Sequence, residues 1–288
     1  MRRNFPNCQF GSTQTLAYLD RPGRGTPILF LHGNGFSKEV FAAQFSSETL
    51  ADHRLLALDL PGHGRSQDAY DPKATYSYAG FAREVEAFIA EIGLERCIVA
   101  GWSLGGQIAL EMLDAMPAIA GVIAFGAAPA PNGPLGILQS MHLSKILLLA
   151  GKGVFTREDA EYFEKACFGE RTTYQFVPTL LRTDPCMRPN LSKSLLYASG
   201  ISQKQRLERS HTPVCLLHGR GEPLIRTSFM RQVSSAALYG GTTIILEQAG
   251  HAPFVQAQSG FERVLKQFAD DVETGTALLA PAQASRAA

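Results

Sequence analysis

The chain has 288 residues, of which 45% are apolar and 18% charged, so it can bury a large core. A net charge of +1 gives no electrostatic footprint for binding nucleic acid or an anionic membrane. No apolar stretch approaches the length of a membrane span, and the arginines near the amino terminus precede no apolar signal segment. The five cysteines are widely spaced without a Cys-x-x-Cys pair, so we expect a cytoplasmic protein with neither a disulfide framework nor a metal site.

The first predicted strands lead to a turn with a possible role in catalysis. Apolar and polar residues alternate over 13–19, and this pattern predicts an edge strand. The apolar run Pro27–Leu31 predicts a buried strand, which ends in the glycine-rich turn His32-Gly33-Asn34-Gly35. Such a turn can aim the backbone N–H of Asn34 or Gly35 at a carbonyl held by a nearby nucleophile. We expect His32 itself to be a buried hydrogen-bonding residue rather than a base.

The next segment is interpreted as structural. A helix over Lys38–Leu50 and a strand over Arg54–Leu58 lead to a turn cluster rich in proline and glycine, Asp59-Leu60-Pro61-Gly62-His63-Gly64-Arg65-Ser66. Because proline restricts φ and glycine permits close packing, this cluster predicts a tight turn, with His63 as a turn residue. Apolar residues at helical spacing over Tyr78–Ile92 then predict a helix that leads to the next strand.

The central motif lies between a buried strand and a helix. The run Cys97–Ala100 is followed by Gly101-x-Ser103-x-Gly105, and a helical pattern begins at Ile108. This is the nucleophile-elbow pattern, in which a serine occupies a cramped strand-to-helix turn that leaves no room for a Cβ at the flanking glycines. The free backbone N–H of Leu104 at the start of the helix suits a developing oxyanion.

The alternation of predicted strands and helices is interrupted by one long segment without strands. After a predicted strand over Gly121–Phe125, residues 129–207 contain no strand pattern, but helices are expected near Leu135–Leu149 and Arg157–Cys167. We predict that 129–207 form a helical lid inserted into a core made of residues 1–128 and 208–272. Residues 273–288, rich in Ala, Thr and Ser, are expected to form a flexible tail.

Two candidate partners for the serine follow the last strands. Glu222 comes after a strand over Pro213–His218, and His251 comes after a strand over residues 242–246; a helix over Phe261–Val272 ends the fold. A serine needs a base to take its proton, and that base needs a third group to orient it. Parallel strands bring their carboxyl ends to one edge of a sheet, so we predict a triad of Ser103, Glu222 and His251. The alternative for Glu222 is an ion pair with nearby Arg220.

These motifs resemble the α/β-hydrolase superfamily over roughly residues 10–270. Within it the chain looks most like the serine-dependent N-acylhomoserine lactonases, which degrade bacterial quorum-sensing signals. Shared features include Tyr70-Asp71-Pro72, Gly101-Trp102-Ser103-Leu104-Gly105-Gly106, Phe155-Thr156-Arg157-Glu158-Asp159, Arg182-Thr183-Asp184, Gly219-Arg220-x-Glu222-Pro223 and Gly250-His251-Ala252-Pro253-Phe254. The resemblance implies an α/β-hydrolase fold, a glutamate as the triad acid, and substrate contacts from Trp102, Tyr162 and Phe163. Phe163 stands where the family has a lid tyrosine.

The expected activity is opening of the lactone ring of N-acylhomoserine lactones through an acyl-enzyme intermediate, without a cofactor. The expected partner is a small-molecule ester or lactone with an acyl chain. A carboxylesterase is the nearest rival, amide cleavage is a second, and a non-catalytic lactone receptor is a rival of another class. Epoxide hydrolases and haloalkane dehalogenases are disfavoured because they carry aspartate where Ser103 stands. A metal-dependent lactonase is disfavoured because the sequence lacks clustered histidines.

Overall fold

The structure, a computed structural model, describes residues 7–9 and 15–278. Within these residues eight strands form one sheet in the order β1-β2-β4-β3-β5-β6-β7-β8. Neighbouring strands from β4 to β8 are parallel, whereas β2 pairs antiparallel with both β4 and β1. The strands are β1 (Asn7–Gln9), β2 (Thr15–Arg21), β3 (Arg24–Leu31), β4 (His53–Leu58), β5 (Cys97–Trp102), β6 (Ile119–Phe125), β7 (Val214–Gly219) and β8 (Ile244–Leu246).

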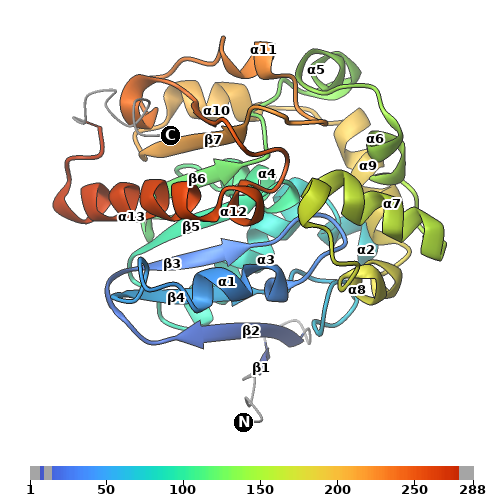
Figure 1. The fold of residues 1–288 in the computed structure, drawn as a ribbon, viewed down its shortest axis with the longest axis horizontal. Coiled ribbons are helices and arrows are strands. Elements are labelled where there is room, and N and C mark those ends of the chain that lie inside the picture. The colour runs from blue at the N-terminus through green and yellow to red at the C-terminus, as the bar shows by residue number, and fades with distance from the viewer. Residues whose placement is uncertain (1–6, 10–14, 279–288) are drawn as a thin grey trace.

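Helices cover both faces of this sheet, and that is why its central strands are apolar along their length. Residues 28–31, 97–100 and 214–217 of β3, β5 and β7 are completely buried. Figure 1 shows α13 crossing one face, while α3 and α4 lie on the other. The ring of Phe261 on α13 packs edge-on against Phe125 of β6, with 4.8 Å between ring centres. The predicted α/β architecture, a mainly parallel sheet flanked by helices, is confirmed.

The helices vary widely in length, and none of those in the described residues is both long and apolar enough to cross a membrane. The α-helices are α1 (Ala42–Phe45), α2 (Pro72–Thr75), α3 (Tyr78–Glu91), α4 (Leu104–Glu111), α5 (Gly133–Ser140), α6 (Lys145–Leu149), α7 (Arg157–Phe168), α8 (Val177–Arg182), α9 (Met187–Leu196), α10 (Gln203–Arg209), α11 (Thr227–Met230), α12 (Pro253–Gln256) and α13 (Gln258–Thr274). Short 3-10 helices are η1 (Lys38–Phe41), η2 (Gly169–Arg171) and η3 (Tyr239–Gly241).

Helices α5 to α10 occupy the chain between β6 and β7. Figure 1 shows α6, α7, α8 and α9 together beyond the end of the sheet toward which β3 points. These helices therefore stand over the carboxyl ends of the parallel strands, where such folds place their ligands. We keep the term lid for residues 129–207, and the division into lid and core remains a prediction.

Two predicted helices are wrong because tertiary contacts compete for their residues. In place of one helix over Lys38–Leu50, the chain forms η1 and the single turn α1, and Ser47 then donates its hydroxyl to Glu262 at 2.7 Å. Serine side chains often compete with helical backbone in this way. The predicted helix over Leu135–Leu149 splits into α5 and α6, because the N–H of His142 donates to Leu224 O at 2.7 Å.

Other boundaries also differ from the predictions. β2 is not the edge strand, because β1 pairs outside it; residues 13 and 14 of the predicted strand lie outside the described residues. Helix α4 begins at Leu104 instead of Ile108. Helix α13 extends beyond Val272 to Thr274, where Gly275, with a φ of 75°, ends it in the left-handed conformation. Of the predicted tail, residues 279–288 lie outside the described residues.

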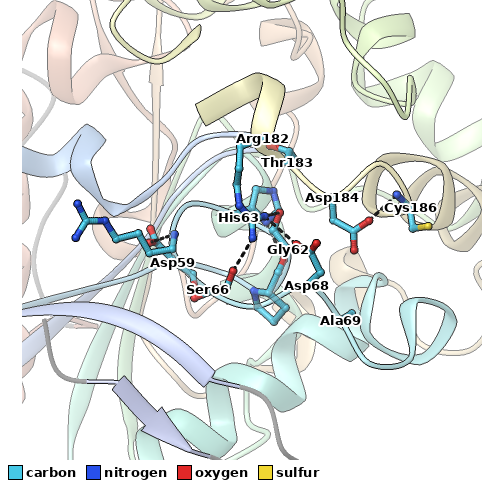
Figure 2. A network of polar contacts seen from close by, with 12 residues as sticks. Asp59, Gly62, His63, Ser66, Asp68, Ala69, Arg182, Thr183, Asp184 and Cys186 are labelled. Carbon is cyan, nitrogen blue, oxygen red and sulfur yellow. Dashed lines mark hydrogen bonds and ion pairs between the residues drawn. The ribbon is translucent and has the colours of Figure 1, made fainter. Parts of the chain in front are cut away.

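The loop after β4 anchors the lid to the core (Figure 2). Within the loop, the Ser66 hydroxyl donates to the backbone oxygen of Asp59 at 2.6 Å. From the lid, Arg182 donates to the backbone oxygens of Gly62 and Ser66, both at 2.9 Å, and the N–H of Asp184 donates to Gly62 O at 2.9 Å. The loop is thus structural, as the sequence predicts, and its contacts to the lid are an addition that the sequence does not indicate.

Candidate active site

Ser103 occupies a strained turn between β5 and α4. Its φ of 52° and ψ of −112° are a conformation that non-glycine residues rarely adopt. The two flanking glycines make the turn possible. A Cβ on Gly101 would lie 2.2 Å from the backbone oxygen of Gly105, and a Cβ on Gly105 would lie 2.1 Å from that of Leu31. The predicted reason for the glycine spacing is therefore confirmed.

The structure brings Ser103, His251 and Glu222 together. Nε2 of His251 lies 3.0 Å from the Ser103 hydroxyl oxygen. Nδ1 of the same ring lies 2.8 and 3.0 Å from the two carboxylate oxygens of Glu222. The backbone oxygen of His251 accepts a hydrogen bond of 2.8 Å from the Trp102 indole, which steadies the loop that carries the histidine. This arrangement allows a proton to pass from the serine to an imidazole held by a carboxylate.

Glu222 is held where the loop after β7 folds back. Its Oε1 accepts the backbone N–H of Leu224 at 2.9 Å and that of Ile225 at 3.3 Å. Burial by itself would raise the pKa of this carboxyl, but the neighbouring His251 and the donated hydrogen bonds outweigh burial and lower the pKa of Glu222 below its ordinary value. The group is therefore a carboxylate that can face the imidazole.

The alternative partner for Glu222 is ruled out by position. Arg220 is half exposed and forms a bidentate ion pair with Glu247, which follows β8. The carboxylate of Glu222, in contrast, is 1% exposed and faces inward. Arg220 is thus paired with a surface carboxylate, and Glu222 remains available to pair with His251.

A second histidine, His218, lies beside the carboxylate, and sequence reasoning missed it. Its Nε2 lies 2.9 Å from the backbone oxygen of Ala127, and its Nδ1 lies 3.9 Å from Oε2 of Glu222. Burial lowers the pKa of His218, with Glu222 opposing the shift. The only sequence signal was its place at the end of a strand four residues before Glu222, which equally suits an ordinary core residue.

Two residues beside Ser103 carry backbone N–H groups that could serve an oxyanion. Among the described residues, no hydrogen bond uses the N–H of Leu104 or that of Asn34, and both residues line the pocket at Ser103. The N–H of Gly35 is also unused among the described residues, but Gly35 does not line the pocket, and a Cβ there would lie 2.3 Å from Nη2 of Arg188. The geometry favours Leu104 and Asn34 over Gly35 as donors to an oxyanion.

The serine opens into a cavity of about 360 Å³ between the sheet and the lid. Its lining is mostly apolar, and much of it comes from the lid residues Ile137, Met141, Ile146, Leu147, Leu148, Phe163, Leu191, Leu195 and Leu196. Trp102 and Phe163 line this cavity. Tyr162, the other predicted substrate contact on α7, is not among the lining residues; its side chain is 40% exposed, with Lys145 Nζ 4.1 Å from its ring centre. Adjacent positions on α7 point to different sides of the helix.

The other two candidate histidines are structural, as predicted. His32 is fully buried, its Nε2 accepts the N–H of Leu60 at 3.0 Å, and its Nδ1 lies 2.8 Å from Gly33 O. His63 is also fully buried, with Nδ1 2.9 Å from the backbone oxygen of Pro61. Burial lowers the pKa of both rings.

A strained serine, a histidine and a buried carboxylate at the ends of parallel strands define a hydrolase of the α/β class. The model of the Alpha/beta hydrolase family matches residues 28–264. The chain therefore belongs to the Alpha/beta hydrolase family, and it is an ester hydrolase.

Two curated proteins similar to the chain carry hydrolase or esterase names. The chain is 24% identical over 267 residues to the AB hydrolase superfamily protein YisY of Bacillus subtilis strain 168, a match that covers 88% of this chain and 95% of that protein. It is 26% identical over 262 residues to the pimeloyl-[acyl-carrier protein] methyl ester esterase of Aliivibrio salmonicida, covering 88% of this chain and 96% of that protein.

The chain is also similar in three-dimensional structure to solved hydrolases. The structure of the N-acyl homoserine lactonase AidH complexed with N-butanoyl homoserine matches with a TM-score of 0.89 and 31% identity, covering 94% of this chain and 97% of that chain. An esterase from Exiguobacterium antarcticum matches with a TM-score of 0.76 and 19% identity over 93% of this chain and all of that chain, so it shares the fold.

Proposed function

We propose that the protein is a serine hydrolase that opens the lactone ring of N-acylhomoserine lactones, with Ser103, His251 and Glu222 as its triad. The observation that carries this proposal is the similarity to the lactonase AidH, which extends over 94% of the chain at 31% identity. The triad geometry supports the serine mechanism. The apolar lid lining supports a substrate that carries an acyl chain.

The proposed reaction begins when His251 Nε2 takes the proton of Ser103 and the serine oxygen bonds to the lactone carbonyl carbon. The negative charge then forms on the carbonyl oxygen, where the N–H groups of Leu104 and Asn34 can stabilise it. As the bond between that carbon and the ring oxygen breaks, the imidazolium returns its proton to the ring oxygen, and Glu222 stabilises the imidazolium meanwhile.

The second half of the reaction releases the product. The leaving alcohol stays attached to the acyl group through the homoserine chain, so water must enter a pocket that is still occupied. His251 takes a proton from this water, whose oxygen bonds to the acyl carbon, and the proton then returns to the Ser103 oxygen as the ester breaks. The product is N-acylhomoserine, and the enzyme is regenerated.

A carboxylesterase is the second candidate function, and the curated relatives favour it. The methyl ester esterase of Aliivibrio salmonicida aligns along nearly its whole length. The same triad and oxyanion donors serve a linear ester, whose alcohol leaves the pocket after the first step. The two functions differ in substrate shape, not in chemistry.

Product analysis tests the proposal. Purified protein is incubated with N-hexanoylhomoserine lactone near neutral pH in the presence of a metal chelator, and the products are identified by mass spectrometry. We expect a gain of one water with the acyl chain still attached, and no gain with the Ser103→Ala variant. Free homoserine lactone would indicate amide cleavage. Turnover of a simple aryl ester without turnover of the lactone would favour the carboxylesterase.

A further inference from the structure

A buried arginine of the lid lies behind the loop that follows β3. Arg188, near the start of α9, has no exposed surface, and its guanidinium carbon lies 3.8 Å from the centre of the Phe155 ring. Its Nε donates to Oδ1 of Asn34 at 2.9 Å. The terminal nitrogens make longer hydrogen bonds to the backbone oxygens of Gly153 and Leu180, at 3.5 and 3.4 Å.

Within the described residues this cation has no anionic partner, since no carboxylate there forms an ion pair with Arg188. Three other lid arginines, at positions 157, 182 and 206, each form an ion pair with a carboxylate. Burial lowers the pKa of the Arg188 guanidinium to about 9, which leaves it charged at neutral pH. A buried charge without a counter-ion opposes folding, and such costs are typically retained at functional sites.

The arginine contacts two residues of the loop beside the serine. Both polar atoms of the Asn34 side chain are held, because Oδ1 accepts from Arg188 and Nδ2 donates to Ala150 O at 3.0 Å. These two bonds fix the amide in place, and no hydrogen bond of the described residues uses the backbone N–H of Asn34, which lines the pocket. At Gly35, a Cβ would lie 2.3 Å from Nη2 of Arg188, so the guanidinium lies directly against the loop backbone.

We propose that Arg188 is a positioning residue for the oxyanion site. It holds Asn34 through the side-chain amide, and it places a positive charge behind the loop whose N–H receives the developing negative charge. Arg188 is outside the pocket lining and acts through Asn34, not by touching the substrate. The proposal rests on the proposed serine mechanism, but not on the identity of the ester.

The expected effect follows from what an oxyanion donor contributes. Loss of one such donor costs about 10²- to 10³-fold in kcat, because the interaction is made in the transition state and strengthened by a dry, low-dielectric site. Loss of a residue that only positions the donor should cost less, on the order of 10- to 100-fold. KM should change little, since the ground-state carbonyl carries no full charge.

The test compares variants of two lid arginines. Arg188→Met removes the charge and the hydrogen bonds while keeping an unbranched chain, and Arg188→Lys keeps a positive charge without the planar guanidinium. Arg182→Met is the matched control, because Arg182 also joins the lid to a core loop but contacts Gly62, Ser66 and Asp68 instead of Asn34 (Figure 2). Each variant is assayed with p-nitrophenyl butyrate and the lactone, well below its own unfolding temperature.

A second readout isolates the transition state. A trifluoromethyl ketone forms a tetrahedral adduct with an active-site serine and places an oxyanion where the reaction does, so its inhibition constant reports that site. We expect Arg188→Met to lower kcat and weaken this inhibitor by similar factors, with KM within about twofold, which is under half a kcal/mol. Arg188→Lys should fall between Arg188→Met and the wild type, and Arg182→Met should keep the wild-type kcat.

Specific outcomes would overturn the proposal. Wild-type kcat in Arg188→Met, or an equal loss in Arg182→Met, would reduce Arg188 to a structural contact. A lysine variant no better than the methionine variant would overturn the role of the charge. If the wild type cleaves the aryl ester but not the lactone, the proposed substrate is wrong, and the comparison of arginine variants on the aryl ester still decides the role of Arg188.

Discussion

Replacing Glu222 by glutamine tests the role of the triad carboxylate without changing its size. Oε1 of Glu222 accepts two backbone N–H groups, so the carbonyl oxygen of the amide must take that position. The NH₂ group then takes the position of Oε2, which lies 3.0 Å from Nδ1 of His251. A donor there favours the imidazole tautomer with its proton on Nε2, and this tautomer cannot accept the proton of Ser103.

The size of the effect can be bounded from this geometry. Loss of an orienting carboxylate costs about 10⁴-fold in kcat where the wrong tautomer is fully imposed. Here Oε1 still lies 2.8 Å from Nδ1 and keeps part of the correct orientation. We therefore expect Glu222→Gln to lower kcat about 10³-fold, which corresponds to about 4 kcal/mol in the activation free energy. KM should change little, because Glu222 does not line the pocket.

The assay follows proton release during lactone opening near neutral pH, where spontaneous opening is slow, and product mass confirms the turnover. Glu247→Gln is the matched control, since this half-exposed carboxylate pairs with Arg220 and should leave kcat unchanged. A kcat within tenfold of the wild type in folded Glu222→Gln protein would refute the reasoning. The same loss in the control would show that the effect is not specific to the triad.

Three further predictions follow from the structure. Phe163→Ala should raise KM for long-chain substrates about tenfold with kcat unchanged, which corresponds to a loss of about 1.4 kcal/mol of substrate binding energy. Tyr162→Phe should leave both kcat and KM unchanged, because this side chain lies outside the pocket lining. Steady-state kinetics with lactones of increasing chain length checks both variants. Gly105→Ala should lower the free energy of unfolding by about 1–3 kcal/mol in urea titrations, because the new Cβ would meet Leu31 O at 2.1 Å; wild-type stability would contradict the elbow geometry. The pKa of Glu222 is lowered in the folded state, so its stabilising contribution is complete above the unfolded pKa of about 4.3 and is lost as pH falls through the lower folded value. Urea titrations at decreasing pH should therefore show a steeper loss of stability in the wild type than in Glu222→Gln, and parallel curves would count against the lowered pKa.

Local sequence determined those parts of the site that depend on local sterics. The spacing of Gly101, Ser103 and Gly105 predicts the elbow because the contacts that exclude a Cβ arise within one turn and the strand beside it. The chain order of Ser103, Glu222 and His251 predicts the triad because each residue follows a strand, and parallel strands end at one edge. The buried strands themselves follow from uninterrupted apolar runs.

Tertiary structure decided what depends on contacts between distant segments. The helix predicted over Leu135–Leu149 breaks because the backbone of His142 bonds to Leu224, a partner that no local pattern reveals. His218 stands only four residues before Glu222, yet no local pattern reveals that its ring lies beside the carboxylate. Sequence spacing leaves Asn34 and Gly35 equivalent as oxyanion donors.

The lid separates Asn34 from Gly35. Arg188 lies 154 positions from Asn34 in the chain, yet it bonds to the Asn34 side chain and packs against the Gly35 backbone. Helical period likewise does not tell which of Tyr162 and Phe163 enters the pocket, because their neighbours on α7 include both polar and apolar residues. Only the packing of α7 places Phe163 beside Phe36 of the core and Phe155 of the lid, and it leaves the Tyr162 ring partly exposed to solvent.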